Sequence, residues 1–229
     1  MSNKITNIRG MRDLLVKDSE KKRSIELIAK KLADNYGYQE INTPIVEYSS
    51  VYNKSLGESS DIVNKEMYNF KDEKDRSLSL RPEATAGIAR AIASNGLLGS
   101  GDYRIPLKFF LFGPMFRYER PQKGRYRQFY QINFEYFSNS SPECDVELIS
   151  LAYNFLLQIK SPINLHINTL GDSKSRNKFK NKLLLYLEKY KNDLSEDSKK
   201  RLYINPLRIL DTKNKSDLKI IKDAPKITS

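Results

Sequence analysis

The chain has 229 residues, of which 39% are hydrophobic and 30% are charged, a composition typical of a soluble globular protein and not of a disordered one. Its formal net charge of +12 favours a polyanionic partner such as RNA, although heavy use of Lys, Asn and Ile, as in an AT-rich genome, explains the charge equally well. The chain has no apolar run near the roughly 18–20 residues of a membrane span, no secretory signal and only one cysteine, so we expect a cytoplasmic protein without a disulfide.

The first predicted element is a helix over residues 18–36, where apolar residues recur at helical spacing and Gly37 supplies a stop signal. An extended segment over 38–46 follows, interrupted by Pro44, which suits an edge or interface strand better than a central one. Because a Pro-bearing strand beside an amphipathic helix needs a covering partner, this region predicts an interface.

Residues 66–70 and 77–81 predict a pair of strands joined by the charged turn KDEKD. The second strand runs into Pro82 and Glu83, and the Ala-rich segment that follows predicts a helix ending near Gly96.

Residues 107–112 predict a buried strand, which Gly113-Pro114 should turn into a basic hairpin over 116–137. A helix should begin at 141–143, where Ser, Pro and Glu provide a cap and early acidic groups. Two further patterns are a buried helical stripe and an alternating strand, made respectively of Val146, Ile149, Ala152, Tyr153 and Leu156, and of Ile163, Leu165 and Ile167.

From Gly171 onward the chain becomes Lys-rich and helical, which indicates a boundary near residue 170. We therefore predict two domains, residues 1–170 and 171–229. The order of elements supports an α+β fold, with an antiparallel sheet flanked by helices.

The hairpin over 116–137 carries the most informative pattern in the chain. Alternation places Arg117 and Glu119 on one face of the first strand, and Gln131, Asn133 and Glu135 on one face of the second. If the strands pair about Gly124, then Arg117 lies opposite Gln131. A solvated sheet face alternates in the same way, but here it adjoins a loop rich in Arg and Lys, so we favour an anion-binding site with a cation-binding corner.

Several kinds of chemistry are excluded by the sequence. His166 is the only histidine, and its place on an alternating segment predicts a structural role. One His and one Cys cannot form a tetrahedral zinc site, and no metal site is predicted. There is no P-loop and no G-x-G-x-x-G sequence, so a nucleotide would have to bind on the antiparallel sheet.

Four segments together resemble the histidyl-tRNA synthetases, a family of class II aminoacyl-tRNA synthetases. IRGMRDLL at 8–15 resembles the N-terminal signature, INTPIVEY at 41–48 motif 1, LRPEATAGIAR at 80–90 the histidine- and ATP-contacting turn, and 116–137 motif 2. The segment YINPLRILDTK at 203–213 resembles the insertion of bacterial members. Four motifs in family order make the resemblance specific.

The resemblance implies a histidine–tRNA ligase, which activates histidine with ATP and Mg²⁺ and then transfers it to tRNA(His). Arg117 matches the catalytic motif 2 arginine that holds the α-phosphate and the carboxylate, a task suited to a planar, permanently charged fork. Glu119 and Arg125 match positions that contact the adenine end and the phosphates of ATP.

The histidine-binding positions of the family fall on Glu83, Thr85, Gln131 and Glu135. Glu83 has an alternative reading, since an acid in the first turn of a helix also favours the helix dipole. The loop residues that match the reader of the tRNA acceptor end are Gln122, Lys123, Arg125 and Arg127, with a plain solvated turn as the alternative.

The resemblance also implies a homodimer formed through the motif 1 region. Family members continue with a second histidine-specific segment, motif 3 and an anticodon-binding domain, none of which is found in these 229 residues. We therefore expect an incomplete catalytic core, the start of an insertion, and little or no activity of this chain alone. The rivals are a non-catalytic paralogue, such as the regulatory subunit of ATP phosphoribosyltransferase, and a truncated RNA-binding remnant.

Overall fold

A computed structural model describes residues 5–57, 60, 62–98, 105–137, 141–168 and 171–227. The chain divides into two compact units, Met1–Ile163 and Asn164–Ser229. Among the described residues, no helix combines the length and the apolar character that a membrane crossing requires.

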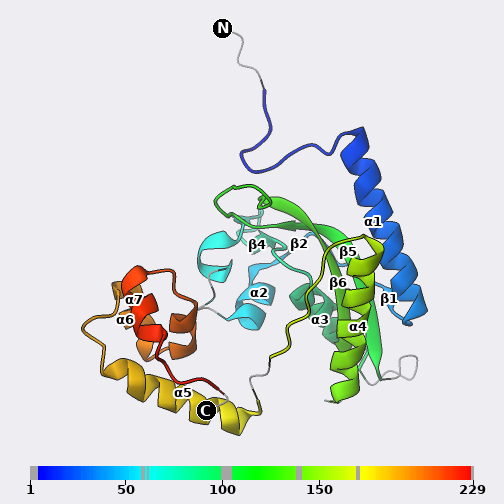
Figure 1. The fold of residues 1–229 in the computed structure, drawn as a ribbon. Helices are drawn as coiled ribbons and strands as arrows, with labels where there is room; N and C mark the ends of the chain where they lie inside the picture. The colour runs from blue at the N-terminus through cyan, green and yellow to red at the C-terminus, as the bar shows by residue number, and fades with distance from the viewer. Residues whose placement is uncertain are drawn as a thin grey trace. The chain divides into compact units, whose positions relative to one another are not determined.

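The main sheet of the first unit is built on a long hairpin (Figure 1). Strands β5 (Leu107–Phe116) and β6 (Gln128–Phe137) pair antiparallel along their whole length, as predicted. The short strand β1 (Gln39–Glu40) adds a parallel neighbour on the other side of β5, which the sequence did not indicate.

Two predictions about this hairpin are wrong. Gly113 and Pro114 lie inside β5 and do not turn it. Proline is tolerated there because β1 pairs only with Phe109 and Phe110, so no strand needs an N–H from position 114 on that side. The register also differs, because Gln131 pairs with Gly113, and the Arg117 N–H donates to the Arg127 carbonyl oxygen at 2.9 Å.

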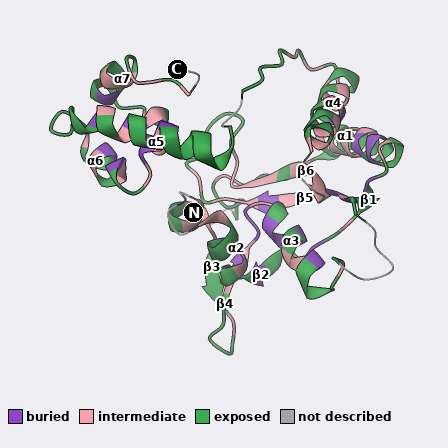
Figure 2. Cartoon of the chain, turned by 90° about the horizontal axis from the view of Figure 1, so that it is seen from below, coloured by how far each residue is buried: buried purple, intermediate pink, exposed green. Residues whose placement is uncertain are grey.

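One face of the hairpin is covered by the helices α1 (Val16–Asn35) and α4 (Pro142–Gln158), which lie side by side in Figures 1 and 2. The predicted first helix and the predicted helix start at 141–143 are thus confirmed. The buried residues of this core are Ala29, Ala33, Tyr38, Phe110 and Leu151.

The opposite face packs against α3 (Thr85–Ser94), and Figure 2 shows buried residues concentrated on α3 and β5. This second core consists of Ala84, Ile88, Ile92, Leu107, Phe109, Leu111 and Met115. Side chains of β5 alternate between the two cores, so the strand is buried on both faces and holds the site rigidly in place.

A second, antiparallel sheet has the order β2-β4-β3, from strands β2 (Val46–Tyr48), β4 (Ser77–Leu80) and β3 (Asn69–Lys71). The predicted strand pair around KDEKD is confirmed. The helices of this region are α2 (Ser49–Leu56) and the π-helix η1 (Ile62–Glu66).

Two other expectations fail. In α4 the inward residue is Leu151, whereas Val146 and Tyr153 of the predicted stripe are exposed. Residues 161–168 contain no strand, and Leu165, His166 and Ile167 are exposed, so the predicted structural role of His166 in a strand is also wrong.

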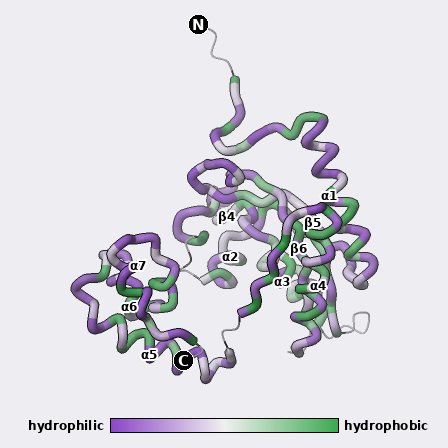
Figure 3. Tube along the Cα trace, in the orientation of Figure 1, coloured by the Kyte–Doolittle hydropathy of each residue, from purple (hydrophilic) through white to green (hydrophobic). Residues whose placement is uncertain are grey.

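The second unit contains α5 (Ser173–Glu188), α6 (Glu196–Leu202), the 3₁₀-helix η2 (Pro206–Asp211) and α7 (Lys215–Ile221). Figure 3 shows hydrophilic residues over much of α5, in agreement with the predicted Lys-rich helices. Beneath this surface lies a small core formed by Phe179, Leu183, Leu187, Leu194, Leu202 and Ile209.

A buried carboxylate joins the elements of the second unit. Asp217 is completely buried and accepts hydrogen bonds from the Ser195 N–H at 2.8 Å and from the hydroxyls of Ser195, Ser198 and Thr212. Burial raises the pKa of Asp217, but these hydrogen bonds outweigh burial and bring the pKa below its ordinary value. The residue is therefore a satisfied structural hub.

Candidate functional site

A buried arginine supports the floor of the site. The guanidinium of Arg81 donates to the Thr43 carbonyl oxygen and to the Pro114 carbonyl oxygen, both at 2.9 Å. Burial lowers the pKa of Arg81 from its ordinary value. Its Nη2 occupies the space that a Cβ at position 113 would need, so only glycine fits there. Sequence reasoning did not single out Arg81, although a charged residue ending an apolar strand was a visible signal.

Three of the four predicted histidine-binding residues form one connected cluster. The Glu83 carboxylate accepts from the backbone N–H groups of Thr85 at 2.8 Å and Ala86 at 2.9 Å, and so caps the start of α3. The Thr85 hydroxyl donates to Glu135 Oε1 at 2.6 Å. Residues from a helix start and from β6, far apart in sequence, are thereby brought together.

Glu135 is a partly buried acid with few hydrogen-bond donors around it. Burial raises its pKa, the hydrogen bond from Thr85 opposes this effect, and the negative charge of Glu83 adds to the rise. A cation placed beside Glu83 and Glu135 would lower the pKa of Glu135 again. The cluster is therefore chemically prepared for a cationic ligand.

The fourth predicted residue, Gln131, lies on the same face of β6 as Glu135, with Asn133 between them. Gln131 Oε1 and Asn133 Nδ2 are both buried and have no hydrogen-bond partner among the described residues. Buried polar atoms are normally paired, so these two atoms are available to a ligand. Asn133 was placed on this face from the sequence but was not chosen as a site residue.

Arg117 lies at the end of β5, beside the start of α3. Its Nε donates to the Pro82 carbonyl oxygen at 2.8 Å, and its guanidinium lies 5.2 Å from the centre of the Phe129 ring. These contacts place a fixed positive charge next to the residue that precedes Glu83. An anionic group bound there would be adjacent to the acidic cluster.

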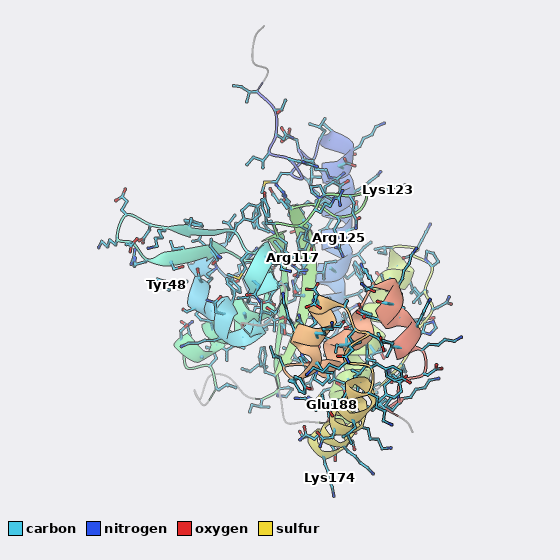
Figure 4. All side chains as sticks on the ribbon, turned by 90° about the vertical axis from the view of Figure 1, so that its left-hand side faces the viewer. Tyr48, Arg117, Lys123, Arg125, Lys174 and Glu188 are labelled. Carbon is cyan, nitrogen blue, oxygen red and sulfur yellow. The ribbon has the colours of Figure 1, made fainter. Side chains whose placement is uncertain are left out.

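The loop of the hairpin carries an ion pair between two predicted ATP-binding residues. Arg125 Nε lies 2.9 Å from Glu119 Oε2, and the Glu119 side chain is 13% exposed whereas that of Arg125 is 58% exposed. Figure 4 shows Lys123 and Arg125 at the loop end of the hairpin, with Arg117 nearer the sheet. Gln122 and Lys123 are exposed.

Arg127, the remaining predicted loop residue, is held by the fold. Its Nε donates to the Glu119 carbonyl oxygen at 3.2 Å, its Nη1 donates to the Arg9 carbonyl oxygen at 3.3 Å, and its guanidinium lies 3.8 Å from the centre of the Tyr118 ring. The side chain is half-buried, unlike those of Gln122 and Lys123.

A cavity of about 870 Å³ lies between the N-terminal segment, α1 and the α1-facing side of the hairpin. Its wall includes Arg12, Lys22, Phe112, Tyr130 and Ile132. It contains none of the predicted site residues, since Gln131 and Glu135 face the other way. The predicted site is thus an open surface of the sheet beside α3, separate from this cavity.

The model of the family described as histidyl-tRNA synthetase matches residues 10–170. The chain belongs to the histidyl-tRNA synthetase family. Its fold is that of the class II synthetase catalytic core, as predicted. Within the described residues, no group of three or more His, Cys, Asp or Glu side chains could hold a metal ion.

Curated relatives of this family include the histidine–tRNA ligase of Ehrlichia ruminantium (strain Welgevonden), 50% identical over 228 residues, which span 99% of this chain and 53% of that protein. The histidine–tRNA ligase of Rickettsia bellii is 48% identical over 227 residues, covering 98% of this chain and 54% of that protein. The chain spans about half the length of the curated relatives it matches.

Among solved structures, the apo histidyl-tRNA synthetase of S. aureus matches with a TM-score of 0.73 and 31% identity, over 98% of this chain and 50% of that one. A Bacillus halodurans protein titled ATP phosphoribosyltransferase regulatory subunit/histidyl-tRNA synthetase matches with a TM-score of 0.58 and 20% identity, over 97% of this chain and 66% of that one. The second likeness concerns the fold alone.

Proposed function

We propose that this chain provides the part of a histidine–tRNA ligase that binds histidine and holds the α-phosphate of ATP. The observation that carries the proposal is the contact between Thr85 and Glu135 beside the capping acid Glu83, with Arg117 fixed at the adjoining Pro82 carbonyl. The relatives with about 50% identity are named histidine–tRNA ligases, which supports this activity.

Histidine would be held by acceptors and turned by position. Its ammonium needs oxygen acceptors, which Gln131 Oε1 and the Glu135 carboxylate offer on one face of β6. Both Glu83 oxygens already accept backbone N–H groups, so Glu83 contributes its charge and fixes the start of α3. The carboxylate of histidine would then point toward Arg117.

Activation is an attack of the histidine carboxylate on the α-phosphate of ATP, with pyrophosphate as the leaving group. Arg117 neutralises both anionic partners and orients them, which lowers the barrier by positioning and by charge stabilisation. Glu119 contacts the adenine end and Arg125 the phosphates, so the ion pair between them opens or is shared when ATP binds. Mg²⁺ usually binds one or two carboxylates plus substrate phosphates, so ATP itself would supply most of its ligands here.

The exposed loop residues Gln122, Lys123 and Arg125, together with Arg127, form the proposed contact with the acceptor end of tRNA(His). Phosphates and base edges are both within the chemistry of Arg and Gln side chains. The motif 1 region would form the homodimer, and the partly exposed side chains Ile45, Val46, Tyr48 and Phe70 provide an apolar surface for it.

The test is calorimetric titration of the 229-residue chain with L-histidine and with ATP, followed by ATP–pyrophosphate exchange. We expect histidine binding that Glu135→Gln weakens, whereas Glu196→Gln, at an exposed ion pair of the second unit, leaves it unchanged. We expect little or no aminoacylation by this chain alone. No binding of either ligand by the well-folded wild type would refute the proposal.

The alternative is a regulatory subunit of ATP phosphoribosyltransferase, which the fold of the Bacillus halodurans protein favours. That function predicts a stable complex with a phosphoribosyltransferase catalytic subunit, and no histidine-dependent pyrophosphate exchange. An assembly experiment by size-exclusion chromatography with that subunit separates the two functions.

A further inference from the structure

The N-terminal segment at Arg9 and Gly10 is fastened to the base of the hairpin loop. The Arg127 N–H donates to the Gly10 carbonyl oxygen at 2.7 Å, while the Arg127 Nη1 donates to the Arg9 carbonyl oxygen at 3.3 Å. These bonds join residues that are more than a hundred positions apart in the sequence, so they fix one segment against the other.

Gly10 meets two requirements at this junction. Its φ of +86° lies in the region that favours glycine, and an added Cβ would lie 2.9 Å from Arg127 Cγ and 2.9 Å from Pro121 Cγ. Any other residue would therefore strain the backbone and push on both sides of the loop. The close approach of Arg127 depends on the missing side chain.

The same arginine holds the opposite side of the loop. Its Nε donates to the Glu119 carbonyl oxygen, and its guanidinium stacks over the Tyr118 ring. The Tyr118 N–H in turn donates to the Glu66 carbonyl oxygen at 2.6 Å. The backbone that carries Glu119 is thus determined by Arg127, and through it by Gly10.

We propose that Arg127 is a positioning residue that clamps the Arg9–Gly10 segment to the loop and thereby sets the Glu119–Arg125 pair for ATP. The proposal rests on the proposed function for its ligand. It assigns the N-terminal segment a role in nucleotide binding, although neither Arg9 nor Gly10 is among the proposed ATP contacts.

The test compares two glycine substitutions with similar backbone cost. Gly10→Ala removes the room for Arg127, whereas Gly37→Ala places alanine at a φ of +74° with no atom within 4 Å of the added Cβ. We expect Gly10→Ala to weaken ATP binding about tenfold. Histidine binding should change less than twofold, because Thr85, Gln131 and Glu135 do not touch the clamp, and Gly37→Ala should change neither affinity.

Arg127→Met and Arg127→Lys give a second arm. Methionine keeps the aliphatic volume but loses the hydrogen bonds, so it should reproduce the loss of ATP affinity, and lysine should restore part of it by donating to a carbonyl. Equal losses of ATP and histidine binding in Gly10→Ala, or equal effects of Gly10→Ala and Gly37→Ala, would overturn the clamp.

Amide hydrogen exchange decides the clamp independently of ATP. The N–H groups of Arg117 and Arg127 should exchange faster in Gly10→Ala than in the wild type or in Gly37→Ala, because both belong to the fastened loop base. Unchanged exchange overturns the clamp. If the wild type binds no ATP while exchange changes as expected, the clamp stands and the ATP part of the proposed function fails.

Discussion

Glu135 in the site and Asp217 in the second unit are both shielded carboxylates, but their surroundings differ. Asp217 accepts from a backbone N–H and from hydroxyls of three neighbouring residues, and its pKa is lowered. Among the described residues, only the Thr85 hydroxyl donates to Glu135, and its pKa is raised. A fully hydrogen-bonded acid stabilises its fold, whereas an under-bonded acid costs stability until a ligand supplies the missing partner.

The largest expected effect comes from removing the satisfied acid. Asp217→Ala leaves a cavity and several unpaired donors, and should destabilise the second unit by about 2–4 kcal/mol. Hydrogen-exchange mass spectrometry of peptides from 173–221 measures this loss. Glu196→Ala, which removes an exposed pair with Lys199, is the matched control and should change exchange little. Equal exchange in both variants would contradict the role of Asp217 as a hub.

The comparison predicts the opposite result for the acid of the site. Glu135→Gln should weaken histidine binding by about tenfold to a hundredfold, because the ammonium loses a charged acceptor. The same variant should be as stable as the unliganded wild type, or more stable by about 1 kcal/mol, since a strained charge is removed. Titration calorimetry and urea unfolding measure the two effects. A variant that loses both binding and stability would show that Glu135 is structural.

A smaller effect is expected at the residue that connects the helix to the sheet. Thr85→Val keeps the shape of the side chain but removes the hydroxyl that donates to Glu135. Histidine binding should fall about fivefold to tenfold, because the carboxylate loses its orientation and not its charge. Thr85→Ser should retain most of the affinity. If valine and serine behave alike, the hydroxyl does not orient Glu135.

The smallest effect is a dependence of stability on pH. The raised pKa of Glu135 means that its destabilising charge appears as pH rises through that pKa, so the stability advantage of Glu135→Gln should be present at pH 7 and absent below about pH 4. The lowered pKa of Asp217 has the opposite sign: its contribution is complete above about pH 4 and is lost as pH falls further. Urea unfolding at pH 7 and about pH 3.5 tests both signs.

The sequence predicted helices and strands where periodicity and punctuation agree. The first helix, the strand pair around KDEKD and the helix beginning at Pro142 are observed. The inner face of α4 could not be predicted, because this helix is apolar on nearly every side and periodicity does not distinguish Leu151 from Tyr153. The alternating residues 163–167 form no strand, since alternation also occurs in an extended segment without a pairing neighbour.

The site was predicted by residue type but not by geometry. The resemblance indicated Glu83, Thr85 and Glu135, which the fold brings together. It did not give the register that places Gln131 opposite Gly113, because a hairpin with an irregular loop need not be centred on its glycine. The bracing by Arg81 depends on side-chain packing between distant segments, which a single sequence does not encode locally.

Arg81 and Gly113 also limit how this family can vary. Because the guanidinium fills the space above Gly113, a larger residue at 113 is compatible only with a shorter residue at 81. A single change at either position passes through a form with a steric clash or with the Pro114 carbonyl left without its donor. The two positions should therefore change together or not at all during evolution, and their joint state would distinguish branches with differently built floors beneath the same acidic cluster.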